Sequence, residues 1–424
     1  MAPGLRLRLS AMMFLEFFIW GSWYGVLAKH LETPPPGGLG FADWQVGNVY
    51  SLFPLASIFM PLLAGQITDR WIPTQAYLGL AHMIGAAGLF MAASAEAYEP
   101  NHLGILIWAV AYAPTISLTN SLAFSHIRNA ERDFGSIRVL GTIGWILAGW
   151  TLAGWRKSEF AIGGNDCLYL AAAASLAMGL FSFLLPSTPP ARAGVSPWAF
   201  LKALSLLKQP RIAVFLLVSV VVAMEMPFYF MYTDQFLQSL GESSENTPLI
   251  LTLAQVAEIA TMLALPWFLS RLGPRKTLFL GALAWPVRYL VFALGKPYPL
   301  VVASLTLHGV CFVFFFVVAF IFIDSVAPKD IKGSAQGLLT LVLYGFGLYF
   351  GSQFAAWIKA RYTTDGVVNW TSIWLVPSVL TVLCAVVLFA TFPRGSMQEV
   401  TAAPQSDRER ELEPARESEL DQRR

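Results

Sequence analysis

The sequence carries little charge for a chain of its length. Only 13% of its 424 residues are Asp, Glu, Lys or Arg, whereas a soluble domain carries about 25%. By contrast, 56% of the residues are hydrophobic, and they lie in runs of about twenty, the length that a helix needs to cross a bilayer. The composition therefore argues against a soluble fold and predicts a protein of the lipid bilayer.

The sequence also lacks a strong net charge, paired cysteines and catalytic motifs, which narrows the range of possible functions. The net charge is only +2, which gives no sign of a nucleic-acid partner. Cys167, Cys311 and Cys384 lie far apart without CxxC spacing, so they predict neither a disulfide framework nor a metal site. The motifs HExxH and GxSxG and any cluster of His and Asp ligands are also missing. We therefore expect no enzyme, no cofactor and no bound metal.

The apolar stretches predict an all-α membrane protein with twelve transmembrane helices. Lys and Arg gather on the segments that a cytoplasmic N-terminus places inside, so both termini are expected in the cytoplasm. The other side holds only Lys29, Arg156, Lys157, Lys296, Lys359 and Arg361. The expected helices are 9–29, 44–68, 74–95, 103–125, 136–155, 167–185, 211–237, 248–270, 276–295, 299–325, 332–360 and 371–392.

The longest expected internal loop divides these helices into two sets of six. Residues 186–210 are basic and contain Pro186, Pro189 and Pro190, which suits a cytoplasmic linker. We expect an N-terminal six-helix bundle at 1–185, this linker, a C-terminal six-helix bundle at 211–392 and a disordered cytoplasmic tail at 393–424. Many secondary transporters pair two such halves around a site near the middle of the membrane.

Glu258 is the strongest candidate for a functional residue. An ionisable side chain in the middle of a bilayer costs at least ~2.5–3.5 kcal/mol, so its presence needs a reason. Glu258 lies about ten residues into an expected helix, about 15 Å deep, with Gln255 and Thr261 on the same face. Its carboxyl group can take up and release a proton, or it can hydrogen-bond a neighbouring helix as a structural residue.

Arg138, Thr142 and Trp145 share one face of another expected helix. A guanidinium, a hydroxyl and an indole at this spacing suit a polar ligand with a flat ring. Arg138 falls in the first turn of the expected helix 136–155, so its side chain could instead extend to the cytoplasmic interface. The residue pattern alone leaves both roles open.

Two further polar positions are candidates for the substrate site. Glu225 precedes Phe228, Tyr229 and Tyr232 on one helical face, which suits either a substrate clamp or aromatic packing. Asn120 belongs to a polar patch on the fourth expected helix that could line a cavity. Four other buried candidates are Glu16, left open between function and structure, Arg288, expected to pair with a buried acid, and His82 and His308, expected to be hydrogen-bonded structural residues.

Several stretches resemble those of a known transporter family. They are Phe18–Trp23 (FIWGSW), Ile58–Pro61, His82–Ala93, Ile137-Arg138 with Gly141–Gly144, Pro266–Arg271 and Ser334–Gly337. On these motifs the chain resembles the nucleoside:proton symporter family of the major facilitator superfamily, from Leu5 to Phe392. The Arg138 segment also looks like the fifth-helix motif of the lactose-permease group, where such an Arg holds the sugar.

The resemblance implies a two-half bundle that alternates between inward- and outward-open states and takes up solute with a proton. It implies that Arg138, Thr142, Gln255 and Glu258 line the nucleoside site, with Trp145 where the family has an aromatic residue. The sequence departs from the family pattern at three places: Pro227 and Phe230 replace a Gln and an Asn, and Val313 replaces an Asp.

We therefore predict a monomeric inner-membrane transporter for nucleosides or similar polar ring compounds, coupled to protons. Glu258 is the expected protonation site, and Arg138 sets its charge or clamps the substrate. Thr142, Trp145, Gln255, Glu225 and Asn120 are expected to shape the pocket. The alternatives are the same fold carrying a sugar, a glycoside or another metabolite, by uptake or efflux. A membrane enzyme is disfavoured because the sequence contains none of the catalytic motifs named above. A solute sensor is disfavoured because it is expected to carry a cytoplasmic signalling domain, for which the expected tail at 393–424 is too short.

Overall fold

The computed structural model describes residues 3–127, 130–190, 203–327 and 332–391. Within these ranges the chain is mostly helical, and nine helical stretches are long and apolar enough to cross a membrane. Residues 191–202 of the expected linker and the whole expected tail at 393–424 lie outside the described residues.

The first helices follow one another through short turns. They are α1 (Pro3–Gly21), α2 (Leu27–Glu32), α3 (Asp43–Arg70), α4 (Thr74–Ala93), α5 (Tyr98–Tyr112), α6 (Thr115–His126), α7 (Ala130–Arg156) and α8 (Asp166–Ser182). The expected helix 9–29 is thus two helices separated by a turn, and the expected helix 136–155 begins earlier, at Ala130.

The second part of the chain has more interruptions. Its elements are η1 (Leu204–Lys208), α10 (Pro210–Ala223), α11 (Glu225–Ser239), α12 (Thr247–Leu251), α13 (Leu253–Leu294), α14 (Tyr298–Ser304), α15 (Leu307–Cys311), η2 (Phe312–Val317), α16 (Val318–Val326), α17 (Lys332–Thr340), η3 (Leu341–Gly347), α18 (Leu348–Arg361), β1 (Thr363–Thr364), β2 (Val367–Val368) and α19 (Trp370–Thr391). The two strands pair antiparallel, with Thr363 opposite Val368.

Local geometry explains where the structure departs from the expected helices. The expected helix 248–270 begins in α12 and continues in α13, which also holds nearly all of the expected helix 276–295. Gly273 divides α13 at a φ of 73°, a backbone conformation that suits glycine. The expected helices 299–325 and 332–360 each contain a π-helical stretch, η2 and η3. Such stretches insert extra backbone into a helix and occur often at functional sites.

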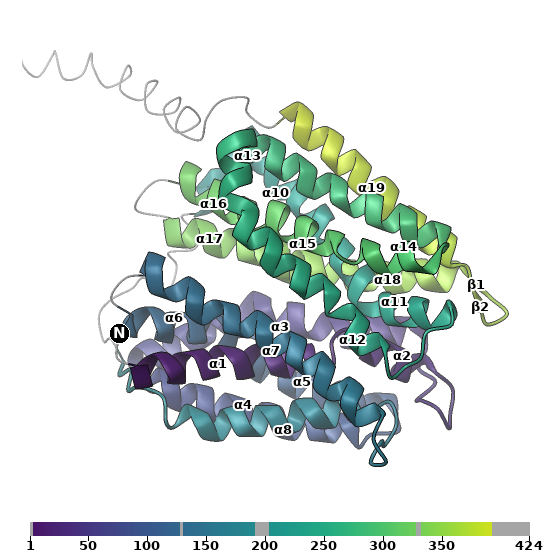
Figure 1. Cartoon of the computed structure of the whole chain (residues 1–424). Helices are drawn as coiled ribbons and strands as arrows, with labels where there is room; N and C mark the ends of the chain where they lie inside the picture. The colour runs from purple at the N-terminus through teal and green to yellow at the C-terminus, as the bar shows by residue number, and fades with distance from the viewer. Residues whose placement is uncertain (1–2, 128–129, 191–202, 328–331, 392–424) are drawn as a thin grey trace, which may run out of the picture.

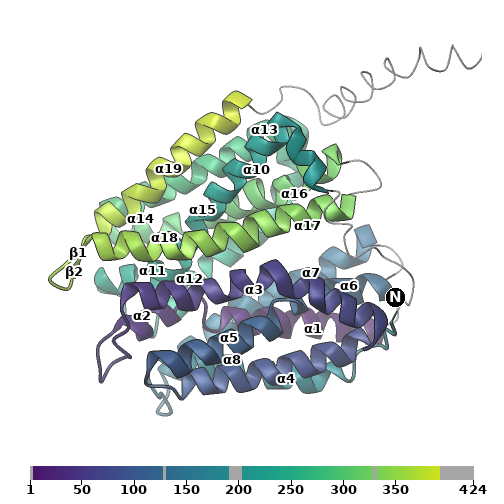
Figure 2. The ribbon, with the colours of Figure 1, turned by 180° about the vertical axis from the view of Figure 1, so that it is seen from behind.

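The helices gather into two groups, which both views of the ribbon show. Helices α1–α8 lie together in the lower half of Figure 1 and helices α10–α19 in the upper half, and Figure 2 shows the same division from behind. Helix α1 packs on α7 in the first group, and α13 packs on α15 and α19 in the second. The groups meet where α3 contacts α18, α7 contacts α12 and α2 contacts α11.

Glycines bring the helices that carry the candidate residues into close contact. A Cβ atom on Gly144 of α7 would lie 2.2 Å from the backbone oxygen of Phe14, so α1 and α7 touch through their backbones. A Cβ atom on Gly309 would lie 2.4 Å from the backbone of Ala257, directly before Glu258. The first contact sets α1 beside the Arg138 helix, and the second sets α15 beside Glu258.

The outer surface is apolar, as a lipid environment requires. Leu63, Leu263 and Val386 are 55%, 79% and 60% exposed, whereas Glu16, Glu225 and Arg288 are fully buried. A water-soluble protein does not present so many large apolar side chains over its helices. Exposed apolar faces of this kind on α3, α13 and α19 are typical of a protein of the lipid bilayer.

Candidate functional site

A cavity of about 460 Å³ lies between the two groups of helices. This volume is in the range of pockets that enclose a small organic molecule. Its walls include Trp20, Phe53, Asn120, Arg138, Thr142 and Trp145 from the first group and Phe230, Gln255, Glu258, His308, Gln336 and Tyr344 from the second. Six predicted site residues, Arg138, Thr142, Trp145, Gln255, Glu258 and Asn120, thus come together around one cavity.

Arg138 lies in the wall of the cavity, beyond the first turn of its helix. Helix α7 begins at Ala130, so Arg138 follows two complete turns, and the alternative of a first-turn residue is wrong. Its guanidinium carbon lies 3.9 Å from the centre of the Phe17 ring, which holds the cation by a cation–π contact. Thr142 and Trp145 continue the same face into the cavity, as their spacing predicts.

Glu258 faces the cavity from the opposite group. It lies on α13 one turn after Gln255, and both residues line the cavity. Glu258 and Arg138 lie close enough to influence each other electrostatically, and each is the charged neighbour that acts most strongly on the other. Thr261, expected on the same face, instead donates its hydroxyl hydrogen to the backbone oxygen of Ala257. The cavity wall therefore contains a carboxyl group from one helix group and a guanidinium from the other.

An aromatic cluster closes the cavity at one end. The Trp145 ring lies 5.5 Å from that of Trp20 and 5.8 Å from that of Phe230, and Phe230 contacts Tyr24 at 5.0 Å. A small pocket of about 30 Å³ shares Trp145, Phe230 and Gln255 with the cavity and extends to Thr252. These rings separate the two spaces and present flat apolar faces on which a planar ring can stack.

The remaining predictions divide between the cavity and the helix interiors. Asn120 lines the cavity, and its buried side-chain oxygen has no hydrogen-bond partner among the described residues. Its neighbour Thr119 donates to the backbone oxygen of Thr115, inside its own helix. Glu225 does not line the cavity, and it lies buried beside Arg288, which acts on it electrostatically. Its predicted role in substrate binding stays a prediction.

Many residues that line the cavity were not predicted as site residues, and His308, Gln336, Phe17 and Tyr344 are four of them. His308 was expected to be hydrogen-bonded and structural; it contacts Arg288, as that expectation requires, but it also lines the cavity. Gln336 belongs to a motif shared with the family, which was the available signal. Phe17 and Tyr344 gave no signal, because nothing in the sequence distinguishes a ring in a cavity wall from a ring in the core.

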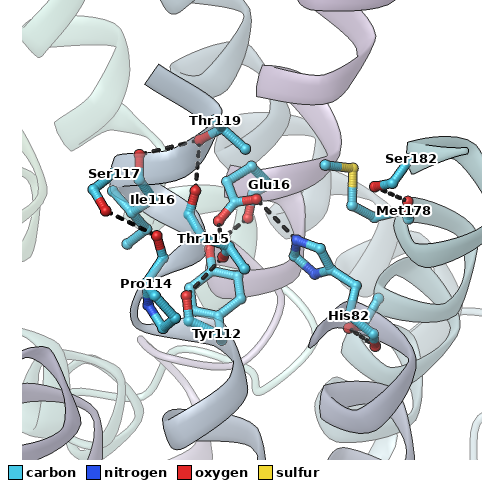
Figure 3. A network of polar contacts seen from close by, with 11 residues as sticks. Glu16, His82, Tyr112, Pro114, Thr115, Ile116, Ser117, Thr119, Met178 and Ser182 are labelled. Atoms are coloured by element: carbon cyan, nitrogen blue, oxygen red, sulfur yellow. Dashed lines mark hydrogen bonds and ion pairs between the residues drawn. The ribbon is translucent and has the colours of Figure 1, made fainter. Parts of the chain in front are cut away.

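Glu16 belongs to a buried polar network behind the cavity wall. Figure 3 shows its carboxyl group between Thr115, which donates a hydrogen bond of 2.6 Å, and His82 at 3.1 Å. The Tyr112 hydroxyl donates to the backbone oxygen of Glu16 at 2.6 Å. The network ties α1, α4, α5 and α6 together, and His82 is hydrogen-bonded as predicted.

Polar contacts join the two groups at the end of the molecule that carries α2, α12 and the β1–β2 turn, here called the hairpin end. Lys359 of α18 forms ion pairs with Glu32 and with Asp43, the latter at 3.3 Å. The Gln353 amide donates to the side-chain oxygens of Asn48 and Ser51, also across the groups. These contacts hold the hairpin end closed, whereas the cavity lies beyond the Trp145 cluster.

A membrane-embedded helical protein with a polar cavity between two helix groups has the architecture of a solute transporter. The family model described as Nucleoside H+ symporter matches residues 3–396. The nucleoside permease NupG of Escherichia coli (strain K12) is 32% identical over 92% of this chain and 96% of its own. The xanthosine permease of the same organism is 31% identical over the same shares. The crystal structure of nucleoside transporter NupG superimposes with a TM-score of 0.82 at 31% identity, covering 92% of this chain and 100% of that chain.

The chain belongs to the nucleoside H+ symporter family. It is therefore a multi-pass inner-membrane transporter that couples nucleoside uptake to protons, and not an enzyme. The resemblance read from the sequence motifs is confirmed over the length that the motifs indicated.

Proposed function

We propose that this transporter binds a nucleoside in the cavity between Arg138 and Glu258 and moves it by alternating access. Glu258 carries the coupled proton. Arg138 compensates the charge of Glu258 when the proton is absent and hydrogen-bonds the substrate when the proton is present. The observation that carries the proposal is that a carboxyl group and a guanidinium from opposite helix groups line the same cavity.

The aromatic and polar walls suit the two parts of a nucleoside. The flat faces of Trp145 and its neighbours suit a base, since aromatic stacking is tolerant of base identity. Thr142, Gln255 and Asn120 supply donors and acceptors for sugar hydroxyls. Glu225 lies outside the cavity wall, so we assign it an indirect role, through Arg288.

We further propose twelve spans in two halves of the major facilitator fold, with both termini in the cytoplasm. Nine stretches meet the criteria of length and hydropathy, α13 contains most of two of the expected spans, and α1 and the 17-residue α8 supply the remaining two. The halves are 1–185 and 211–392, joined by 186–210 and followed by a cytoplasmic tail at 393–424. We propose that one chain is the working unit, because the cavity is built within one chain.

The smaller number of Lys and Arg residues in the segments at the hairpin end supports an orientation in which this end faces outside the cell. In that orientation the contacts of Lys359 form an outer gate, and the cavity belongs to a state closed to the outside. The lining residues Pro61, Phe320 and Thr340 extend away from the hairpin end, toward the cytoplasm.

Removal of Lys359 is expected to open the outer gate. Lys359 is 5% exposed, and breaking a buried ion pair by removing one partner costs about 3–5 kcal/mol in the closed state. In a Lys359→Ala variant, a cysteine placed at Leu251 of the small pocket should react at least about tenfold faster with an impermeant maleimide added outside. The test uses a background without the three native cysteines. Lys157→Ala, at an exposed lysine, is the matched control, and an equal labelling rate in both variants would contradict the gate.

Trp145 is expected to contribute to substrate affinity. Base–aromatic stacking contributes about 1–3 kcal/mol per base, so Trp145→Ala should raise the KM for uridine by about 5- to 100-fold. Trp145→Phe retains an aromatic face and should change KM by less than about threefold. Trp357→Ala, at a 61% exposed residue of α18, controls for the loss of an indole. A KM that is unchanged by Trp145→Ala would exclude stacking on this ring.

Uptake of labelled solutes into cells expressing the protein tests the proposed function. Labelled uridine and adenosine should enter with saturable kinetics that collapse when a protonophore is added, and labelled maltose and melibiose should not enter. Uptake of a disaccharide in place of nucleosides would show that the cavity serves the alternative substrate class. Expression and membrane insertion are checked in the same cells with a tagged chain.

A further inference from the structure

His308 is a cavity residue whose neighbours fix its orientation. Its ring stacks on Tyr229, with centroids 4.7 Å apart and planes at 23°, and also on Phe312, at 6.1 Å and 19°. The residue is only 2% exposed, yet it forms part of the cavity wall. These two ring contacts, together with the near-perpendicular contact of Phe230 at 6.0 Å, restrict the orientation of the imidazole in the cavity wall.

The hydrogen bond to Arg288 determines which ring nitrogen of His308 carries the proton. Arg288 Nη1 lies 3.0 Å from His308 Nδ1. A guanidinium has donors and no acceptor, so Nδ1 must accept the hydrogen bond and carries no proton. The neutral ring therefore carries its hydrogen on Nε2, where it is a donor.

Aromatic rings surround the guanidinium of Arg288, and a second buried ionisable residue lies near it. Arg288 is fully buried, with its guanidinium carbon 4.4 Å from the centre of the Tyr229 ring and 4.7 Å from that of Trp285. The Glu225 carboxyl group is also fully buried and interacts electrostatically with Arg288. The Tyr289 hydroxyl donates to the Glu225 backbone oxygen at 2.7 Å, which ties α11 to α13. The guanidinium thus contacts the aromatic rings around it and hydrogen-bonds the histidine ring, and Glu225 lies near enough to act on it electrostatically.

We propose that His308 contacts the substrate, donating its Nε2 hydrogen to one acceptor atom of the nucleoside. Arg288 and Glu225 are positioning residues, which act on the substrate only through His308. The inference rests on the proposed function and deepens it. It places a defined donor in a stretch of wall that is otherwise apolar, between Phe230 and Phe312. The acceptor is a sugar oxygen or a base carbonyl oxygen, and the test below distinguishes them.

The test is transport by purified protein in proteoliposomes, with a set of uridine analogues that each lack one good acceptor. The set is 2′-, 3′- and 5′-deoxyuridine with 2- and 4-thiouridine. His308→Phe retains the stacked ring without a donor, and it should raise the KM for uridine about tenfold, the value of one hydrogen bond, with Vmax within about twofold. For one analogue of the set the same substitution should leave KM unchanged, because that analogue lacks the acceptor. His308→Gln returns an amide donor and should restore most of the affinity, and His102→Gln, outside the cavity, is the matched control.

If His308 has only a structural role, His308→Phe should raise the KM of every analogue by the same factor. That result would overturn the proposal. Arg288→Met should lose the same analogue selectivity as His308→Phe. If His308→Phe does not fold, the wild-type protein with ¹⁵N-labelled histidine supplies the answer. Its His308 resonances, assigned by their absence from His308→Gln, should show Nδ1 unprotonated and should shift when uridine is added. Unmoved resonances at saturating uridine would overturn the proposal, whereas a wild-type protein that takes up no uridine would contradict the proposed function itself.

Discussion

Glu258→Gln is expected to abolish accumulation of nucleoside against its gradient. The amide keeps the shape and hydrogen-bonding capacity of the protonated carboxyl group but cannot release a proton, so the cavity can still bind and exchange substrate. A pH difference of one unit is worth about 1.4 kcal/mol per proton, which supports about tenfold accumulation if one proton accompanies each nucleoside. The wild-type protein should reach that ratio in proteoliposomes, and the variant should stop at a ratio of about one.

Counterflow exchange separates a coupling defect from a folding defect in this variant. Vesicles loaded with unlabelled uridine should exchange it for labelled uridine at a rate within about threefold of the wild type, because exchange needs no net proton movement. Gln255→Glu, one turn earlier on the same wall, tests whether any carboxyl group in the cavity can replace Glu258. A Glu258→Gln variant that still accumulates nucleoside with a pH gradient would remove Glu258 from the coupling mechanism.

Arg138→Gln is expected to lower both uptake and exchange by about 100-fold. The substitution leaves Glu258 without the positive charge that acts on it across the cavity. It also removes the cation–π contact with Phe17 and the donors for the substrate. Initial rates and KM in proteoliposomes measure the effect.

Arg138→Lys should not restore transport, because a lysine ammonium cannot reproduce the planar, multiply donating guanidinium. Arg361→Gln, at an exposed arginine of α18, is the control for loss of a positive charge. Normal exchange by Arg138→Gln would show that Arg138 serves the structure alone. Rescue by lysine would show that only its charge matters.

Site residues that lie on one face of the same helix could be predicted from the sequence. The intervals between Arg138, Thr142 and Trp145, and between Gln255 and Glu258, place each set on one helical face, and both faces line the cavity. Burying an ionisable residue in a bilayer is costly, so the sequence alone made Arg138 and Glu258 candidates for a functional role. The spacing within single helices therefore identified five residues of the cavity wall, including the charged side chains of Arg138 and Glu258.

The relations between helices could not be predicted in the same way. Periodicity gives the residues that share a face of α11, but not which face meets the cavity, so Glu225 was expected there while Phe230 lines the wall. Lys359 and its partner Glu32 are far apart in the sequence, and only the packing of α18 against α2 and α3 brings them together. The kink at Gly273 and the π-helical stretches likewise depend on how neighbouring helices pack.

Proton movement evoked by a nucleoside is the most direct test of the central claim, that Glu258 couples nucleoside to proton in this cavity. Proteoliposomes are placed in weakly buffered medium without a pH gradient, uridine is added outside, and the external pH is recorded. The account predicts that uridine makes the medium more alkaline with the wild-type protein and leaves it unchanged with Glu258→Gln. Uridine entry without proton movement, or an equal proton signal from the variant, would contradict it.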